Sequence, residues 1–345
     1  MKLTRQLLVL VGFCGVADLI AATTFADNRT GCRGADETEV REDEPTRPAQ
    51  RPVHDEFDLQ SPGDLDCDTE NAAPFMPVKD FPMLPAEYSL GPCSAVATNS
   101  KGELLLFHRG KHPILCVDAG GKLLRSWGDE HIGKAHGLRV DRQDNVWVTD
   151  IARHRVLKFD SAGKLLLSLG TGKPGTGIDE FDQPTDIAFG TNGDVFVSDG
   201  YGNSRVVKFS ATGRFLKSWG TRGPKLGEFQ LPHSIIMDSK DRLLVGDRDN
   251  NRIQLFDVDG NALAQWEGFA PYGLAINGDG QVFVADGHEH QVLRLDAAGK
   301  VQQRWGRKGP ALGEFDLPHM LTFDSAGNLF VAEVGNMRFQ KFVKK

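Results

Sequence analysis

Three histidines stand at the same place in three copies of a repeated pattern, and imidazole nitrogens are common metal ligands in proteins. Each histidine precedes an alternating apolar run, which a polar turn separates from a second apolar run. Such a pair of runs predicts a β-hairpin, whose two ends lie together. The first and closing residues of the three copies are His136 and Asp150, His233 and Asp247, and His319 and Glu333.

The same pattern recurs in three further copies that begin with a different residue. They start at Ser94, Thr185 and Tyr272, so the six copies follow one another at intervals of 39 to 49 residues. We call the first residue of each copy the ring position. A third and a fourth strand follow each hairpin, and four-stranded units with this period are typical of propeller blades. The sequence therefore predicts an all-β fold, a six-bladed β-propeller with four antiparallel strands per blade.

The sixth unit ends at Lys345 after its third strand, residues 339–343, with no fourth strand. An open propeller would leave strand edges exposed. We therefore expect an N-terminal strand from residues 81–90 to complete the last blade and close the ring. The alternative is that residues 81–90 form a loop.

The regions before the repeats differ from them in composition. Residues 1–26 contain basic Lys2, an apolar run and small residues before Asp27, which favours a cleaved signal peptide. An uncleaved anchor is the alternative, although Asp18 interrupts the apolar run. Residues 27–77 are rich in acidic residues and proline, which predicts a disordered linker ahead of a propeller at 78–345. We expect a secreted or periplasmic protein with no membrane span after signal cleavage.

The net charge bears on nucleic-acid binding, and the cysteine content bears on disulfide formation. A net charge of −7 gives no basic footprint for nucleic acid. An exported protein can form disulfides, but the four cysteines after the leader allow three pairings that the sequence does not distinguish. These cysteines are Cys32, Cys67, Cys93 and Cys116.

Ring closure would gather the ring positions around one axis. Histidine occupies them in blades two, four and six, which places three imidazoles about 120° apart by the symmetry of the ring. Three histidine ligands with one open position are typical of catalytic zinc, whereas structural zinc has four protein ligands. The alternative is that histidine merely suits strand entry. Its placement in alternate blades favours a metal site.

Further side chains fall on the same face. Arg109 and Arg248 follow the closing residues of blades one and four, and Tyr201 lies two residues after the closing residue of blade three. Guanidinium groups bind carboxylates through two hydrogen bonds, and a phenol near a dication can act as a base. The alternatives are solvated loop arginines and a tyrosine that packs on its turn.

Two other sets of residues are expected to be structural. The closing carboxylates should hold the loops that follow them, as Asp199 could with Asn203 and Arg205. Histidines away from the ring position are expected at the surface. They are His108, His112, His131, His154, His288 and His290.

Several motifs together resemble a known family. HRG at 108–110, HGLRVD at 136–141, DGYGNSR at 199–205, LPHS at 231–234 and FDLPH at 315–319 occur in the order and spacing of peptidyl-α-hydroxyglycine α-amidating lyases. That family has a six-bladed propeller of NHL-type repeats, and the resemblance covers roughly residues 90–343. It implies a catalytic zinc on the three ring histidines, an essential tyrosine at Tyr201 and an active-site arginine at Arg109.

The resemblance also implies a structural calcium ion in the axial channel. Its ligands would be the backbone carbonyls of Val96 and Leu138 and an aspartate directly after the third histidine. This chain has Met320 at that position, and a thioether offers calcium no oxygen. The calcium site therefore lacks its side-chain ligand.

The reaction that the resemblance implies is cleavage of a peptide's C-terminal α-hydroxyglycine to the peptide amide and glyoxylate. Tyr201 would take the hydroxyl proton, and Arg109, with Arg248, would hold the carboxylate. A separate hydroxylating enzyme would supply the substrate, or the substrate would be another carbinolamide. One alternative is a non-catalytic NHL-repeat propeller that binds a peptide or protein. Another is a metal-dependent hydrolase such as a lactonase, which the dispersed carboxylates disfavour.

Overall fold

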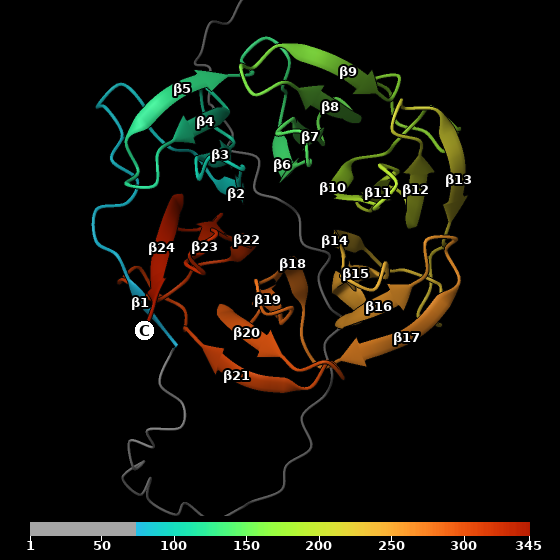
Figure 1. The fold of residues 1–345 in the computed structure, drawn as a ribbon. Coiled ribbons are helices and arrows are strands. Elements are labelled where there is room, and N and C mark those ends of the chain that lie inside the picture. Colours follow the sequence, from blue (N-terminus) through green and yellow to red (C-terminus); the bar gives the residue numbers. More distant parts are fainter. Residues whose placement is uncertain (1–73) are drawn as a thin grey trace, which may run out of the picture. The chain divides into compact units, whose positions relative to one another are not determined.

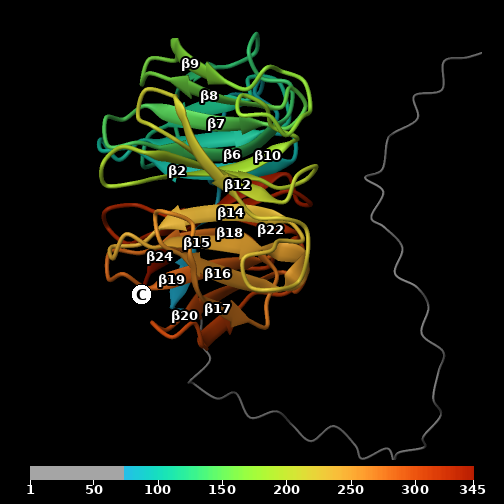
Figure 2. The same cartoon turned by 90° about the vertical axis from the view of Figure 1, so that its right-hand side faces the viewer.

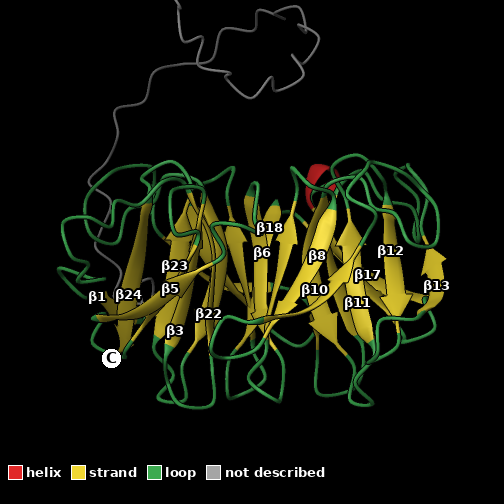
Figure 3. Cartoon of the chain, turned by 90° about the horizontal axis from the view of Figure 1, so that it is seen from above, coloured by secondary structure: helices red, strands yellow, loops and turns green. Residues whose placement is uncertain are grey.

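The computed structural model describes residues 74–345, which form six four-stranded antiparallel sheets. The sheets are arranged around a central axis like the blades of a propeller (Figure 1). Seen side-on, the strands run between two faces made of loops (Figure 3). The predicted six-bladed propeller is therefore confirmed.

The innermost strands have the same length in every blade, and so do the second strands. The innermost strands are β2 (Cys93–Thr98), β6 (Ala135–Val140), β10 (Pro184–Phe189), β14 (Pro232–Met237), β18 (Pro271–Ile276) and β22 (Pro318–Phe323). The second strands are β3 (Leu104–His108), β7 (Val146–Asp150), β11 (Val195–Asp199), β15 (Leu243–Asp247), β19 (Val282–Asp286) and β23 (Leu329–Glu333). Each innermost and second strand pair is one of the predicted hairpins.

The third and fourth strands complete each blade. The third strands are β4 (Ile114–Val117), β8 (Arg155–Phe159), β12 (Arg205–Phe209), β16 (Arg252–Phe256), β20 (Gln291–Leu295) and β24 (Arg338–Lys344). The outermost strands are β5 (Leu123–Trp127), β9 (Leu165–Leu169), β13 (Phe215–Trp219), β17 (Ala262–Glu267), β21 (Val301–Trp305) and β1 (Phe75–Pro77). Figure 2 shows β6, β7, β8 and β9 of blade two at increasing distance from the middle of the propeller. A short helical turn, η2 (Arg248–Asn250), follows β15.

The core lies between neighbouring blades. Second strands such as β11, Val-Phe-Val-Ser-Asp, are buried along their whole length because a sheet covers each face. Phe196 of blade three shares one apolar cluster with Phe229 and Phe256 of blade four. Burying one such side chain stabilises the fold by roughly 1.5–3 kcal/mol relative to leaving it exposed. Blade-to-blade packing therefore holds the innermost strands, and the residues on them, in place.

The closing strand comes from a different segment than the one predicted. β1 pairs with β24, with Phe75 opposite Lys344 and Pro77 opposite Phe342, and the two lie side by side in Figure 1. An N-terminal strand does complete blade six, but the assignment to residues 81–90 was wrong. That segment contains two prolines, which cannot donate to a strand ladder, and its Phe81 packs in the apolar cluster that contains Phe330.

Because of this strand, the propeller starts earlier in the chain than the predicted range of 78–345. It begins at Phe75, inside the segment that the sequence analysis assigned to the linker. The predicted signal peptide and the rest of the predicted linker lie outside the described residues. Within residues 74–345, no helix is long and apolar enough to cross a membrane. Cys93 and Cys116 are buried and are not joined to each other.

Candidate metal centre

Local distortions of the innermost strands aim the ring-position side chains. In blade four, Pro232 pairs with Asp247 and Ser234 pairs with Gly246, which leaves His233 unpaired in a bulge. Equivalent irregularities contain His136 and His319. Because a bulge bends its strand and re-aims a side chain, each imidazole can leave the sheet and point toward the axis.

The three ring histidines meet at the axis. Their imidazole centres lie 4.7 to 4.8 Å apart. All three side chains are buried, and one nitrogen of each lies within 4.8 Å of the others. The structure thus brings His136, His233 and His319 into one cluster that could hold a metal ion.

Backbone carbonyls from the other three blades orient these imidazoles. The Nδ1 atoms of His136, His233 and His319 lie 2.7, 2.6 and 2.6 Å from the carbonyl oxygens of Thr185, Tyr272 and Ser94, respectively. A carbonyl oxygen can only accept, so each Nδ1 carries the proton and donates it. In a neutral ring Nε2 then keeps its lone pair, as a metal ligand requires. The donor chemistry of the cluster therefore fits zinc.

Burial keeps the three rings neutral. It lowers the pKa of His319 to about 3, with the positive charge of Arg109 acting in the same direction. It also lowers the pKa values of His136 and His233 well below their ordinary value, and neighbouring histidine and arginine charges add to the effect. Neutral imidazole is the form that binds metals, so no proton must leave Nε2 near pH 7.

A phenol and two guanidinium groups surround the cluster. The Tyr201 hydroxyl lies 3.1 Å from Nε2 of His136 and 3.2 Å from Nε2 of His233. Arg109 donates from Nε to the carbonyl of Ala135, the residue before His136. Arg248 begins η2, the red helical turn at the upper loop face in Figure 3. All the predicted zinc, base and carboxylate-binding residues therefore share one mouth of the axial channel.

The sequence analysis gave Tyr272 a ring position but no role. In the structure the Arg248 guanidinium lies over two phenol rings, 4.8 Å from the centre of Tyr272 and 5.7 Å from that of Tyr201. The missing side chain of Gly287 makes room for Tyr272, because a Cβ there would lie 2.6 Å from its ring. Tyr272 therefore positions Arg248. An aromatic residue at a ring position was the signal that could have indicated this.

The closing carboxylates are structural, as expected. Asp199 accepts hydrogen bonds from Asn203 at 2.8 Å, from Nε of Arg205 at 2.9 Å and from the backbone N–H of Asp182 at 2.8 Å. Asp247 holds Asn250 and Arg252 in the same way. These buried acids are occupied by their own loops and are not arranged as metal ligands.

The expectation that His108 lies at the surface was wrong. Its ring is fully buried, its Nδ1 accepts from the N–H groups of Gly91 and Gly110, and its Nε2 faces the carbonyl of His112. Burial lowers its pKa to about 4. His108 closes the second strand of blade one, where the other blades have a buried carboxylate. That equivalence was the signal that could have placed it inside.

The residues around the implied calcium site do not fit that ion. Met320 is buried in an apolar cluster that includes Ala95 and Leu138. Val96 is buried in a neighbouring apolar cluster. The Met320 side chain supplies no oxygen in place of the missing aspartate, and calcium requires six to eight oxygen ligands.

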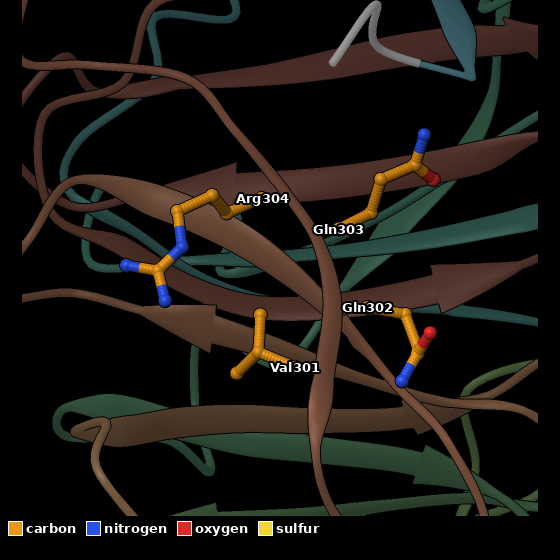
Figure 4. A pocket seen from close by; sticks show the side chains of 4 residues that line it. All are labelled: Val301, Gln302, Gln303 and Arg304. Carbon is orange, nitrogen blue, oxygen red and sulfur yellow. The ribbon is translucent and has the colours of Figure 1, made fainter. Parts of the chain in front are cut away.

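A surface hollow lies on a different strand from the metal-site residues. It has a volume of about 430 Å³ and is lined by Val301, Gln302, Gln303 and Arg304 of β21 (Figure 4). β21 is the outermost strand of blade five, whereas the metal cluster lies on innermost strands. Among the described residues, the three ring histidines form the one group that could hold a metal ion.

Comparisons with known proteins agree with the repeat fold. The NHL repeat family matches residues 181–209. The chain is 31% identical to NHL repeat-containing protein 3 of Mus musculus, over 75% of this chain and 81% of that protein. It is 30% identical to peptidyl-alpha-hydroxyglycine alpha-amidating lyase 1 of Drosophila melanogaster, over 74% of this chain and 58% of that protein.

Two further similarities concern a longer relative and a solved structure. The chain is 31% identical to peptidylglycine alpha-amidating monooxygenase of Rattus norvegicus over 83% of its own length, and it spans 34% of that protein. A streptogramin B lyase structure superimposes with a TM-score of 0.59 over 79% of this chain and 98% of that one. Its identity is 16%, so this likeness shows the shared fold alone.

Proposed function

This chain belongs to the NHL-repeat β-propeller family that includes the peptidyl-α-hydroxyglycine α-amidating lyases, and we propose that it is a zinc-dependent lyase. Its substrate is a C-terminal α-hydroxyglycine or a related carbinolamide, which it cleaves to an amide and glyoxylate. The observation that carries this proposal is the convergence of three neutral imidazoles, whose Nε2 atoms keep their lone pairs, beside a phenol and two guanidinium groups.

His136, His233 and His319 hold the metal through their Nε2 atoms in this proposal. When bound, zinc would supply a Lewis acid that lowers the pKa of a substrate hydroxyl. The carbonyls of Thr185 and Tyr272, with that of Ser94, keep the imidazoles in the required tautomer. Such partners fix ring orientation and strengthen metal binding.

Tyr201 is the proposed general base. Its oxygen lies within 3.2 Å of two of the metal-facing nitrogens, so it can reach a hydroxyl group held at the same point. In its phenolate form Tyr201 removes the hydroxyl proton and becomes the phenol, and the oxygen's electron pair forms the carbonyl of glyoxylate. The carbon–nitrogen bond breaks, its electrons pass to the amide nitrogen, and the phenol returns the proton there. Atoms and charge balance without a further reactant.

Arg109 and Arg248 are the proposed carboxylate-binding residues. The guanidinium of Arg248 lies over two phenol rings and its Nε pairs with Asp249 at 2.8 Å, which restricts the side chain before the substrate arrives. Preorganisation of this kind reduces the entropy cost of orienting the substrate. Two positive side chains beside neutral imidazoles make the mouth suitable for an anionic group such as the substrate's terminal carboxylate.

The proposed reaction needs a hydroxylated substrate. We propose that a separate oxidative enzyme introduces the hydroxyl group and that this protein acts outside the cytoplasm. Transfer of the hydroxylated product to the mouth described above would then precede cleavage.

Glyoxylate release tests the proposed function. Zinc-loaded protein is incubated with a peptide that ends in α-hydroxyglycine, and glyoxylate and peptide amide are quantified together. Equal amounts of both products are expected, with none above background from metal-free protein. Tight zinc binding without product would overturn the lyase proposal and favour a non-catalytic NHL-repeat propeller that binds a peptide or protein partner.

A further inference from the structure

A buried ion pair lies in the axial channel next to the metal centre. Arg139, three residues after His136 on β6, donates from Nε to one oxygen of Asp186 at 3.0 Å and from Nη2 to the other at 2.6 Å. The Asp186 side chain is fully buried, and that of Arg139 is 16% exposed. This two-pronged geometry is the strongest that arginine forms with a carboxylate.

The pair connects four blades. One oxygen of Asp186, on β10, also accepts from the hydroxyl of Ser234 and from the N–H of Ile235 on β14, both at 3.0 Å. Nη2 of Arg139 reaches the carbonyl of Leu274 on β18 at 3.2 Å. The Ser234 hydroxyl in turn accepts from the N–H of Leu274. A single guanidinium and a single carboxylate therefore join β6, β10, β14 and β18.

These contacts lie directly behind the groups that form the metal site. Asp186 follows Thr185, whose carbonyl orients His136, and Ser234 follows His233. Met320, on β22 of blade six, instead belongs to an apolar cluster, and its thioether offers an ion no oxygen.

We propose that the Arg139 guanidinium is the resident cation of the axial channel. It joins blades two to five behind the three-histidine centre, so the chain needs no divalent ion at that place. A guanidinium suits this role because it is always charged and its fork matches a carboxylate. Asp186 supplies the compensating charge, and Ser234 and Leu274 satisfy remaining hydrogen bonds. The inference is independent of the proposed lyase activity.

Thermal unfolding of zinc-loaded protein with and without added calcium chloride tests the first half of the proposal. The Tm of the wild-type protein should be the same in both buffers, and metal analysis after dialysis against calcium should find none retained. A rise in wild-type Tm with calcium, or about one retained calcium per chain, would overturn the proposal, because a ligand that binds the native state raises stability.

Removing the guanidinium tests the second half. Arg139→Met leaves the Asp186 carboxylate buried without its partner, and it should lower the Tm by roughly 6–10 °C. The matched control is Arg142→Met, since Arg142 is exposed and makes one long contact, 3.5 Å to the carbonyl of Thr191. The control should change the Tm by about 1–2 °C or less. Equal effects of the two substitutions would contradict the assigned role.

Charge and packing are separated by a double variant. Arg139→Met combined with Asp186→Asn removes both charges, so its Tm should lie above that of Arg139→Met alone, whereas simple loss of packing would make the two decreases add. Arg139→Lys keeps the charge without the two-pronged geometry and should lose less than Arg139→Met. This variant also preserves the test if Arg139→Met does not fold, and a loss as large as full unfolding in Arg139→Lys would count against the proposal.

Discussion

The metal centre and the closing position of blade one each contain buried histidine, but they use it in opposite ways. His108 accepts through Nδ1 from two backbone N–H groups, and its Nε2 faces a backbone carbonyl. In the ring histidines Nδ1 faces the carbonyl, and the remaining nitrogen is available to the cluster, in which one nitrogen of each ring lies within 4.8 Å of the others. The two sites therefore require opposite tautomers.

This difference separates a structural histidine from a candidate ligand. Burial lowers the pKa in both places, so a lowered pKa does not identify the functional residue. In each ring histidine one nitrogen is hydrogen-bonded to a backbone carbonyl, and the other is directed toward a point that the three rings share. Metal affinity requires such an open lone pair, and His108 has none to offer within its network.

The largest expected effect is on metal content, which should differ between substitution of a ring histidine and substitution of His108. His233→Ala should reduce bound zinc from about one per chain to a small fraction, because a catalytic zinc site has three protein ligands and cannot spare one. His108→Gln is the matched control, since it alters a buried histidine outside the cluster. It should keep its zinc. Metal analysis after dialysis checks both, and equal zinc in His233→Ala and wild type would place the metal elsewhere.

The next effect concerns turnover without loss of metal. Tyr201→Phe removes a hydroxyl that lies beside two Nε2 atoms but is not counted among the ligands. We expect wild-type zinc content and a decrease in kcat on the order of 10²- to 10⁴-fold, as for loss of a general base. Glyoxylate assays beside metal analysis measure both quantities. Near-normal turnover would exclude Tyr201 as the base.

The free energy of unfolding at acidic pH should depend on the protonation of His108. Its folded-state pKa of about 4 lies below the ordinary value of 6.5, so the neutral form is stabilised by folding. This contribution is fully present above pH 6.5 and is lost as the pH falls toward 4, by roughly 3 kcal/mol at pH 4. The stability advantage of wild type over His108→Gln should therefore shrink across that range.

Chemical denaturation at several pH values measures this advantage. The three ring histidines are present in both proteins, so their titration largely cancels in the difference. A difference in unfolding free energy that stays constant from pH 6.5 to 4 would show that His108 does not hold the assigned protonation state.

The smallest expected effect is on substrate selection. Arg109→Ala should reduce kcat/KM for a substrate with a free terminal carboxylate by about 10- to 100-fold, as for loss of a charge-assisted hydrogen bond. A substrate whose carboxylate is capped as an amide should change little. Arg214→Ala, at an exposed turn, is the control. Equal losses on the two substrates would contradict carboxylate binding by Arg109.

Much of the candidate site followed from local sequence patterns. The hairpin repeat placed His136, His233 and His319 at equivalent positions, and ring closure then required them to converge. Arg109 and Tyr201 were placed at the same mouth by counting from the closing residues. These predictions were possible because strand alternation and turn spacing are local properties that each blade repeats.

Only the tertiary structure decided which groups complete the site. The carbonyls that orient the imidazoles come from neighbouring blades, and the Arg139–Asp186 pair joins residues 47 positions apart. Such contacts depend on how closely two sheets approach, as at Gly137, where a Cβ would lie 2.4 Å from the carbonyl oxygen of Thr185. The closing strand Phe75–Pro77 is too short for a distinctive pattern, and pairing with β24 makes it a strand. The sequence by itself determined the repeat and the positions of the reactive side chains, whereas packing between blades decided their tautomers, their partners and the ion pair behind them.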